Sequence, residues 1–202
     1  MSILSDLEII QTCRDQEKKN IAPMIFPYID RAVKQEETGR RVLSYGVSSY
    51  GYDVRLAEEF KIFSNVNAAV IDPKNFTSEC LITAELRTDD LGAKYVILPP
   101  NSYLLGHTLE EFNIPRDVMV VCVGKSTYAR AGVQVNVTPI EPGFQGTVVI
   151  EIANNTSLPV KIYANEGISQ FLFFKGKFPC AVSYADRKGK YQGQQGLVTP
   201  RV

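Results

Sequence analysis

The stretch TVVIEIAN, residues 147–154, decides the fold class of this chain. Most of its positions hold β-branched or apolar residues, which favour the extended backbone of a β-strand. Similar short runs precede and follow it along the sequence. They are YDVRLAEEFKIF (52–63), VNAAVID (66–72), KYVILPPNSYLLGHTLEEF (94–112), VMVVCV (118–123), VQVNVT (133–138), VKIYA (160–164) and ISQFLFF (168–174).

Turn-forming residues separate these runs, as expected for consecutive strands. The turns lie at residues 99–101, 114–117, 141–143 and 154–156. Many short strands without intervening helices predict a mainly β fold, such as a sandwich, a jelly roll or a barrel. Near the N-terminus, residues 1–13 have the apolar spacing of one short amphipathic helix with Ser5 as its N-cap. Residues 14–40 are polar and are predicted to form loops.

The composition fits one globular domain that spans residues 1–202. Hydrophobic residues make up 45% of the chain and charged residues 22%, which are ordinary values for such a domain. Lys plus Arg is 22 and Asp plus Glu is 22, so the basic excess of a nucleic-acid-binding protein is missing. The sequence contains neither a run of eighteen apolar residues nor a signal-peptide pattern. We therefore expect a cytoplasmic protein without a membrane partner.

The single histidine and the four cysteines restrict the chemistry further. One histidine cannot build a multi-histidine zinc site, and His107 lies in a strand-like run, where a packed or hydrogen-bonded side chain is expected. The cysteines are far apart in sequence, which excludes a C-x-x-C redox pair and favours free, mostly buried thiols. They are Cys13, Cys80, Cys122 and Cys180.

Glu151 is the unusual residue of the apolar strand. Because side chains alternate along a strand, Glu151 shares a face with Thr147 and Val149, while Val148 and Ile150 point into the core. A carboxylate on such a strand is partly desolvated, which raises its pKa and suits it to general acid–base catalysis. The alternative is a glutamate that faces solvent on an edge strand or pairs with an arginine.

The stretch GKSTYARAG (124–132) begins like the end of a phosphate-binding P-loop. A P-loop needs a glycine five residues before its Gly-Lys pair, and Met119 occupies that position. Apolar residues fill the interval, so a strand is predicted to enter a turn there. The cluster of Lys, Ser, Thr and Arg then has two explanations, a solvated turn between strands or a site for an anionic ligand.

Two further segments complete the candidate site. TPIEPGFQG (138–146) is predicted to form a tight hairpin turn whose Glu141 either serves only the turn or lines a pocket shared with Glu151. The C-terminal segment YADRKGKYQGQQGLVTPRV is too rich in glycine and glutamine for a core strand. It is predicted to form an arm or lid over residues 183–202.

These segments together resemble the dCTP deaminase family of the trimeric dUTPase-like superfamily. The similarity rests on GKSTYARAG, NVTPIEPGFQGTVVIEI, Gln170 and SYADRKGKYQGQQG in this order, and GYDVRL and PPNSYLLGHTLEEFNIPRDV fit it too. It covers the chain from about residue 45 onward. It implies a distorted β jelly roll of the dUTPase-like (β-clip) type with a short N-terminal helix, assembled as a homotrimer with active sites between subunits.

The resemblance also implies an activity, namely hydrolysis of dCTP to dUTP and ammonia. Magnesium would accompany the triphosphate without a metal site of its own, dTTP would be an inhibitor, and residues 183–202 would close over the nucleotide. Glu151 would be the general base and acid, with Ser126 and Arg130 in support. The nucleotide would be bound by Lys125, Ser126, Thr127, Tyr128, Ala129, Arg130, Val148, Val149, Ile150, Glu151, Gln170, Tyr184, Lys190 and Gln194.

The sequence lacks the zinc motifs of the familiar cytidine deaminases, H-x-E and P-C-x-x-C. Leu109 stands where H-x-E needs its glutamate, and Pro179-Cys180 is followed by Ala-Val-Ser. A deaminase of this sequence is therefore expected to work without zinc.

The sequence leaves three other functions open. A dUTPase would hydrolyse the triphosphate instead of the base, but Glu141 stands where dUTPases carry an aspartate that orients water. A bifunctional deaminase would carry out both reactions and release dUMP. A non-catalytic β-sandwich that binds nucleotide or serves assembly would not depend on Glu151.

Overall fold

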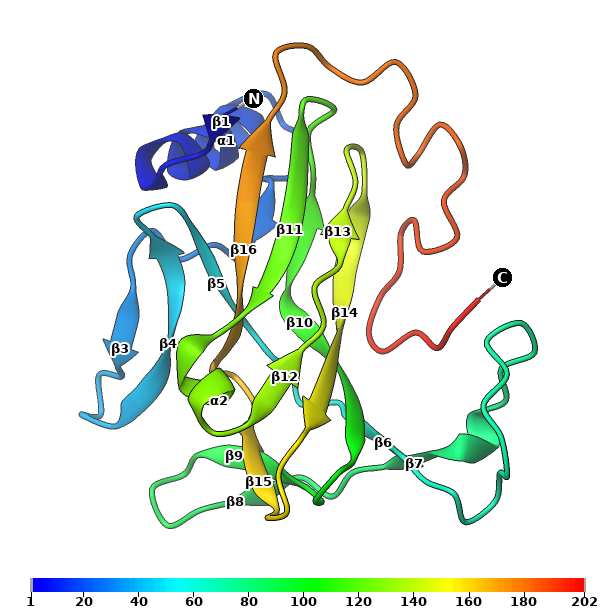
Figure 1. Ribbon diagram of the computed structural model, residues 1–202. Coiled ribbons are helices and arrows are strands. Elements are labelled where there is room, and N and C mark those ends of the chain that lie inside the picture. Colours follow the sequence, from blue (N-terminus) through cyan, green and yellow to red (C-terminus); the bar gives the residue numbers. More distant parts are fainter. Residues whose placement is uncertain (1, 202) are drawn as a thin grey trace.

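The largest sheet of the molecule confirms the mainly β architecture predicted from the sequence (Figure 1). In this computed structural model, which describes residues 2–201, seven strands form that sheet in the order β13-β11-β16-β5-β4-β3, with β1 paired to β16. The strands are β1 (Ser2–Ile3), β3 (Val33–Gln35), β4 (Arg41–Ser48), β5 (Gly51–Arg55), β11 (Val118–Gly124), β13 (Pro139–Ile140) and β16 (Gly167–Lys175).

A second sheet of six strands follows the order β12-β14-β10-β6-β7, with β2 paired to β10. Its strands are β2 (Ile25–Phe26), β6 (Lys61–Phe63), β7 (Leu81–Thr83), β10 (Tyr103–Asn113), β12 (Val133–Val135) and β14 (Gln145–Asn154). A third sheet, in the order β15-β9-β8, consists of β8 (Arg87–Thr88), β9 (Lys94–Leu98) and β15 (Val160–Tyr163). A 3₁₀ turn at Ser78–Cys80 leads into β7.

The core lies between the two larger sheets. Phe112 on β10 packs against Phe171 on β16 with 5.0 Å between the ring centroids, which joins the second sheet to the first. Val120 and Ile150 come from opposite sheets and are both buried. The alternation predicted for 147–154 is confirmed, because Val148, Ile150 and Ile152 are buried while Val149 and Glu151 are partly exposed.

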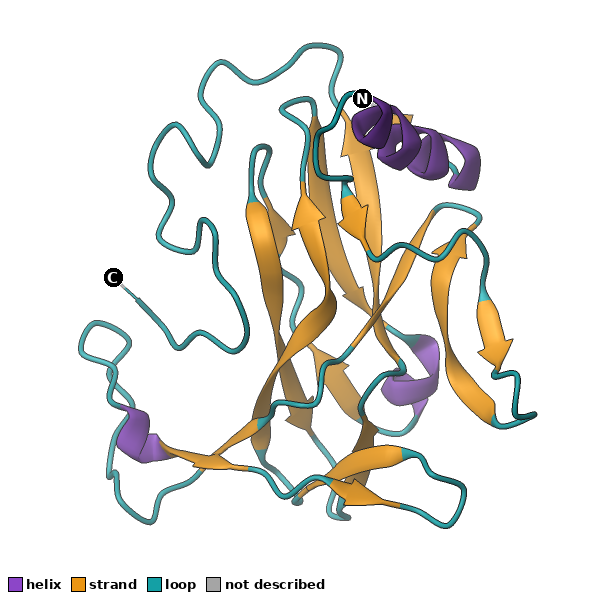
Figure 2. Cartoon of the chain, turned by 180° about the vertical axis from the view of Figure 1, so that it is seen from behind, coloured by secondary structure: helices purple, strands orange, loops and turns teal. Residues whose placement is uncertain are grey.

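The N-terminal helix α1 (Asp6–Lys18) begins where the sequence predicts and ends five residues later than expected. Its N-cap is Ser5, whose side chain accepts from the backbone of Glu8, and the Glu8 carboxylate accepts from the backbone of Ser5 in return. This capping box fixes the first turn. The prediction of loops throughout 14–40 is therefore wrong, because 14–18 continue the helix and β2 and β3 lie within that segment (Figure 2).

The TPIEPGFQG segment is not a hairpin. β13 pairs with β11 in the first sheet, whereas β14 pairs with β10 and β12 in the second. The segment thus crosses from one sheet to the other. Its backbone also contacts the loop between β10 and β11, where Gly143 N donates to Ile114 O at 3.0 Å. A pattern of two apolar runs around Pro-Gly does not distinguish a hairpin from such a crossing.

The GKST segment is not a simple turn either. Ser126–Arg130 form the short helix α2 between β11 and β12. Tyr128 anchors it, since its side chain is 5% exposed and its hydroxyl accepts from Tyr163 N at 2.9 Å. Gly132 follows the helix with φ +76°, a conformation that glycine adopts without strain.

The histidine and cysteine predictions are confirmed. His107 Nδ1 lies 2.9 Å from Thr108 O, and its Nε2 lies 3.5 Å from a Glu59 carboxylate oxygen. All four cysteines are free, and only Cys180 is partly exposed. No helix within residues 2–201 has the length and apolar character that crossing a membrane requires.

Candidate active site

Glu151 lies in the middle of the second sheet, on a strand with a neighbour on each side. On β10, Leu105 is directly opposite it, and on the β12 side Asn136 N donates to Glu151 O at 3.0 Å. The edge-strand alternative is therefore excluded. The β-branched residues around Glu151 favour this central position, and the alternation leaves its side chain on the face away from the core.

The Glu151 carboxylate is half-buried. Burial raises its pKa above the ordinary value, although a hydrogen bond from its own backbone acts in the opposite direction. Among residues 2–201, no arginine or lysine pairs with it. The prediction of a partly desolvated glutamate is confirmed. Such a group holds a proton more readily than a solvated carboxylate, as a general acid–base catalyst requires.

This raised pKa has a consequence for stability. The folded state binds the Glu151 proton more tightly than the unfolded state does, so stability is lost as pH rises from the unfolded pKa, about 4.3, through the folded one. Glu151→Gln removes that loss and is expected to raise Tm at about pH 7.5 while leaving it unchanged near pH 4. Thermal unfolding at both pH values measures this.

The matched control is Glu111→Gln, which makes the same change at an exposed position on β10. A gain in Tm for Glu151→Gln that is equal at both pH values would contradict the argument, because a neutral glutamate would then be no better tolerated than an ionised one.

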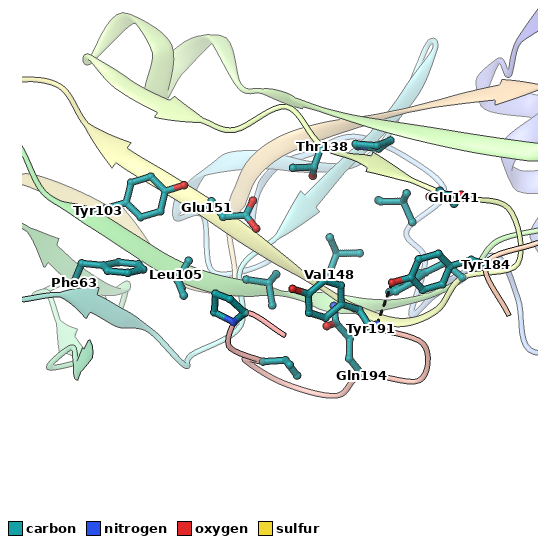
Figure 3. A pocket seen from close by; sticks show the side chains of 16 residues that line it. Phe63, Tyr103, Leu105, Thr138, Glu141, Val148, Glu151, Tyr184, Tyr191 and Gln194 are labelled. Carbon is teal, nitrogen blue, oxygen red and sulfur yellow. Dashed lines mark hydrogen bonds between the residues drawn. The ribbon is translucent and has the colours of Figure 1, made fainter. Parts of the chain in front are cut away.

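A cavity of about 380 Å³ opens in front of Glu151 (Figure 3). Leu105 and Val149 form its floor together with Glu151, and Glu141 and Phe144 line the side next to the sheet crossing. Of the two explanations for Glu141, the structure supports the pocket shared with Glu151. The mostly apolar lining with a few polar groups is typical of a small-molecule site.

The C-terminal arm covers the remaining side of this cavity. Tyr184, Tyr191 and Gln194 line it, and Figure 1 shows the arm returning alongside β14. Gln194 forms a short parallel bridge with Gly146, with Thr147 N donating to Gln194 O at 3.0 Å and Gln194 Nε2 donating to Thr147 O at 2.6 Å. Tyr191 N donates to the Tyr184 hydroxyl at 3.0 Å, which folds the arm upon itself.

The contact between the arm and β14 depends on a glycine. Gly146 has φ +124°, and an added Cβ would lie 2.3 Å from Gln194 O. Gly146→Ala is therefore expected to displace the arm and to speed tryptic cleavage after Arg187 and Lys190 by at least about tenfold, since proteolysis follows the open population. Limited proteolysis with mass spectrometry measures the rate.

Gly92→Ala is the control for backbone strain, because Gly92 has φ +81° and no atom within 4 Å of an added Cβ. Equal cleavage rates for the two variants would show that the arm is not held at Gly146.

The charge of the cavity is its most informative feature. Glu141 and Glu151 are its charged lining residues, and no lysine or arginine within residues 2–201 lines it. The Glu141 carboxylate is paired with Arg187 of the arm, and Lys190 is exposed, its Nζ 5.3 Å from the Tyr191 ring centroid. The cavity of one chain therefore lacks the cations that a triphosphate requires.

Comparison with known proteins places this chain in a family. The family model described as dCTP deaminase-like matches residues 3–176. The chain belongs to the dCTP deaminase-like family. It is 55% identical to the dCTP deaminase of Gluconobacter oxydans and 54% identical to that of Acidobacterium capsulatum, in both cases over 202 residues and 100% of each chain.

A solved structure shows the same fold in the family. The crystal structure of 2'-deoxycytidine 5'-triphosphate deaminase from Agrobacterium tumefaciens matches with a TM-score of 0.56 at 17% sequence identity. The match covers 86% of this chain and 48% of that longer one. It agrees with the mainly β fold expected from the resemblance.

Family membership draws attention to α2, which lies outside the cavity. Ser126, Thr127, Ala129 and Arg130 are exposed, and none of them lines the cavity of their own chain. The Lys125 ammonium is paired with Asp53. The structure therefore does not bring Ser126 or Arg130 to the Glu151 cavity of the same chain, and their support of Glu151 stays a prediction that requires a site between subunits.

Gln170 also lies away from the cavity. It is on β16, opposite Val123 and Asp53, and its Nε2 donates to Ser48 Oγ at 2.8 Å. Lys125, Asp53 and Gln170 thus form a separate polar group on the first sheet. Of the predicted site residues, the structure brings together Val148, Val149, Glu151, Tyr184 and Gln194.

Buried side chains limit some of the other predicted contacts. Tyr128 and Ile150 are 5% and 1% exposed, so only their backbone groups remain for a ligand. Sequence reasoning missed Phe63, Tyr103 and Tyr191, which line the cavity. Tyr103 shares a strand face with Leu105. Pairing the run 94–112 with the run 147–154 would therefore have placed Tyr103 near Glu151.

Proposed function

We propose that this protein hydrolyses dCTP to dUTP and ammonia, as a cytoplasmic enzyme of pyrimidine deoxynucleotide metabolism. The observation that carries the proposal is the half-buried Glu151 carboxylate, which has no ionic partner within residues 2–201 and faces a largely apolar cavity. The names of its full-length relatives support dCTP as the substrate.

Glu151 would perform both proton transfers. Its carboxylate takes a proton from water as the water oxygen bonds to C4 of cytosine, which gives a tetrahedral intermediate. The proton then passes to the C4 amino group, and the C–N bond breaks so that ammonia leaves with its electron pair. The hydrogen of the new C4 hydroxyl moves to N3, which completes the C4 carbonyl and the N3–H of uracil. A carboxyl whose pKa is raised by burial suits both the acceptance and the return of this proton.

Cations would reach this site from a second copy of the chain. Residues 2–201 place no basic side chain on the cavity, whereas Arg130 and Ser126 are exposed on α2. In a homotrimer with sites between subunits, α2 of one subunit would face Glu151 of the next. Arg130 and Ser126 would then orient the water and the carboxylate and stabilise charge in the transition state. Lys125 and Thr127 would face the phosphates.

The remaining contacts come from β14 and the arm. Backbone groups of Val149 and Ile150 would bind the base and sugar, and Tyr184, Lys190 and Gln194 would close over the nucleotide. Because residues 2–201 place only two carboxylates on the cavity, one of them paired with Arg187, magnesium would be held mainly by the triphosphate. In the same cavity dTTP would compete with dCTP.

Zinc independence is part of the proposal. No group of three His, Cys, Asp or Glu side chains among residues 2–201 could share a metal ion. The cavity lining includes neither cysteine nor histidine within the same residues. These side chains do not fit the zinc site of the cytidine deaminases, so activation of water falls to Glu151.

An assay with dCTP and magnesium tests the proposal by separate detection of ammonia and pyrophosphate. Ammonia with dUTP is the expected result. Equal release of both products would identify a bifunctional deaminase that forms dUMP, and pyrophosphate from dUTP alone would identify a dUTPase. Neither product from either nucleotide would overturn an enzymatic function.

A further inference from the structure

Tyr103 lies next to Glu151 on the same face of the second sheet. In the β10–β14 register, Leu105 is opposite Glu151 and Tyr103 is opposite Ala153. Tyr103 and Glu151 are therefore diagonal neighbours, a distance that an aromatic side chain can span. Figure 3 shows the Tyr103 hydroxyl on the side of the ring that faces Glu151.

Asn136 flanks Glu151 from the opposite strand. Its backbone N donates to Glu151 O at 3.0 Å, which continues the β12–β14 register and places its side chain on the same face. Asn136 Nδ2 donates to the Tyr103 hydroxyl at 2.5 Å. The hydrogen bond from Asn136 to Tyr103 thus bridges β14 from one side to the other.

The hydrogen bond from Asn136 leaves the phenolic proton of Tyr103 available for another acceptor. The Tyr103 oxygen accepts from Asn136, so its own proton remains free to donate. Phe63 packs on the ring with 5.4 Å between centroids and an interplanar angle of 72°, which holds the ring in place. Burial and the nearby Glu151 charge raise the pKa of Tyr103, so the phenol keeps its proton at neutral pH.

The other titratable groups around Glu151 are engaged elsewhere or lie farther away. His107 contacts Glu59, Glu141 pairs with Arg187, and the Tyr184 and Tyr191 hydroxyls accept from the backbone of the arm. Cys122 is buried on β11 with a raised pKa. Lys61 shares the face but lies beyond Leu105, on β6.

We infer that Tyr103, held by Asn136, is a positioning residue that donates its phenolic hydrogen to the Glu151 carboxylate. This hydrogen bond fixes the orientation of the carboxylate toward the cavity, and it stabilises the ionised form that accepts the proton from water. The inference rests on the proposed function insofar as Glu151 is the catalytic base, but the inferred hydrogen bond does not depend on that role.

The test is Tyr103→Phe, which removes one oxygen from the cavity wall. Loss of the donor should move the acid limb of the kcat/KM profile to higher pH by about one unit, lower kcat severalfold and leave KM for dCTP nearly unchanged. Tyr95→Phe, which removes a tyrosine hydroxyl on β9 outside the cavity, is the control. An unmoved acid limb in Tyr103→Phe would overturn the inference.

A second variant tests whether Asn136 acts through Tyr103. Asn136→Ala should move the acid limb in the same direction by a smaller amount, and the Asn136→Ala/Tyr103→Phe double variant should match Tyr103→Phe alone. Additive shifts would show that Asn136 does not act through Tyr103. If Tyr103→Phe fails to fold, as judged by circular dichroism, the shift in Asn136→Ala alone decides.

A titration of Glu151 without substrate tests the Tyr103 hydrogen bond independently of the proposed function. The Glu151 carboxyl carbon can be titrated by ¹³C NMR in the folded protein, with the resonance assigned by its loss in Glu151→Gln. Tyr103→Phe should raise the Glu151 pKa there as well. If wild-type protein releases no ammonia from dCTP, the proposed function fails, while an unchanged Glu151 titration would overturn the inference about Tyr103.

Discussion

Glu151→Gln is expected to lower kcat for dCTP deamination by at least about 10³-fold, the upper part of the range for loss of a general acid–base group. Glutamine keeps nearly the same shape and polarity but can neither take a proton from water nor return it to the amino group. The fold has no reason to change, because the Glu151 side chain carries no ion pair among residues 2–201. Ammonia release under saturating dCTP and magnesium measures the effect.

Binding of dCTP should survive the same substitution. The cavity is lined mostly by apolar side chains and by the arm, and these contacts do not depend on the charge of Glu151. Calorimetric titration of Glu151→Gln with dCTP should therefore give a Kd within about threefold of the KM of the wild-type protein. Glu111→Gln, an exposed substitution on β10, should keep full activity. Near-normal turnover by Glu151→Gln would remove Glu151 from the mechanism.

The sequence predicted the strand that carries Glu151 because a single periodicity determines both its conformation and its burial. Val148, Ile150 and Ile152 could face only the core, so Glu151 had to lie on the other face. The capping box at Ser5 was also readable, since it depends on residues three positions apart. Local signals of this kind need no knowledge of the rest of the fold.

Pairing between distant segments was beyond reach of the same reasoning. TPIEPGFQG has the composition of a hairpin turn, yet the pairing of β13 with β11 is decided by long-range packing of the two sheets. Tyr103 lies next to Glu151 only through the β10–β14 register, which joins segments more than forty residues apart in sequence. The proposed role of Arg130 cannot be derived from a single chain, which leaves this residue exposed and outside the cavity.

Substitution of the exposed Arg130 gives the second large expected effect. Arg130→Ala and Glu151→Gln should each be inactive as pure proteins, and a mixture of the two should regain activity. If each site takes Glu151 from one subunit and Arg130 from the next, a site is complete when an Arg130→Ala subunit supplies Glu151 and its Glu151→Gln neighbour supplies Arg130. In randomly mixed trimers this occurs at about one quarter of the sites, one half times one half.

Co-expression of the two variants with different affinity tags, followed by purification on both tags, isolates the mixed trimers for the ammonia assay. Every mixed trimer has one complete site of three whichever variant is in excess, so its activity should be about one third of wild type. Mixing Glu151→Gln with Glu151→Ala is the control, because two defects at one residue cannot complement each other in any assembly. Activity in the Arg130→Ala mixture no higher than in this control would contradict a shared site. The cations that the Glu151 cavity lacks would then have to come from its own chain, through a rearrangement of the arm that brings Lys190 inward.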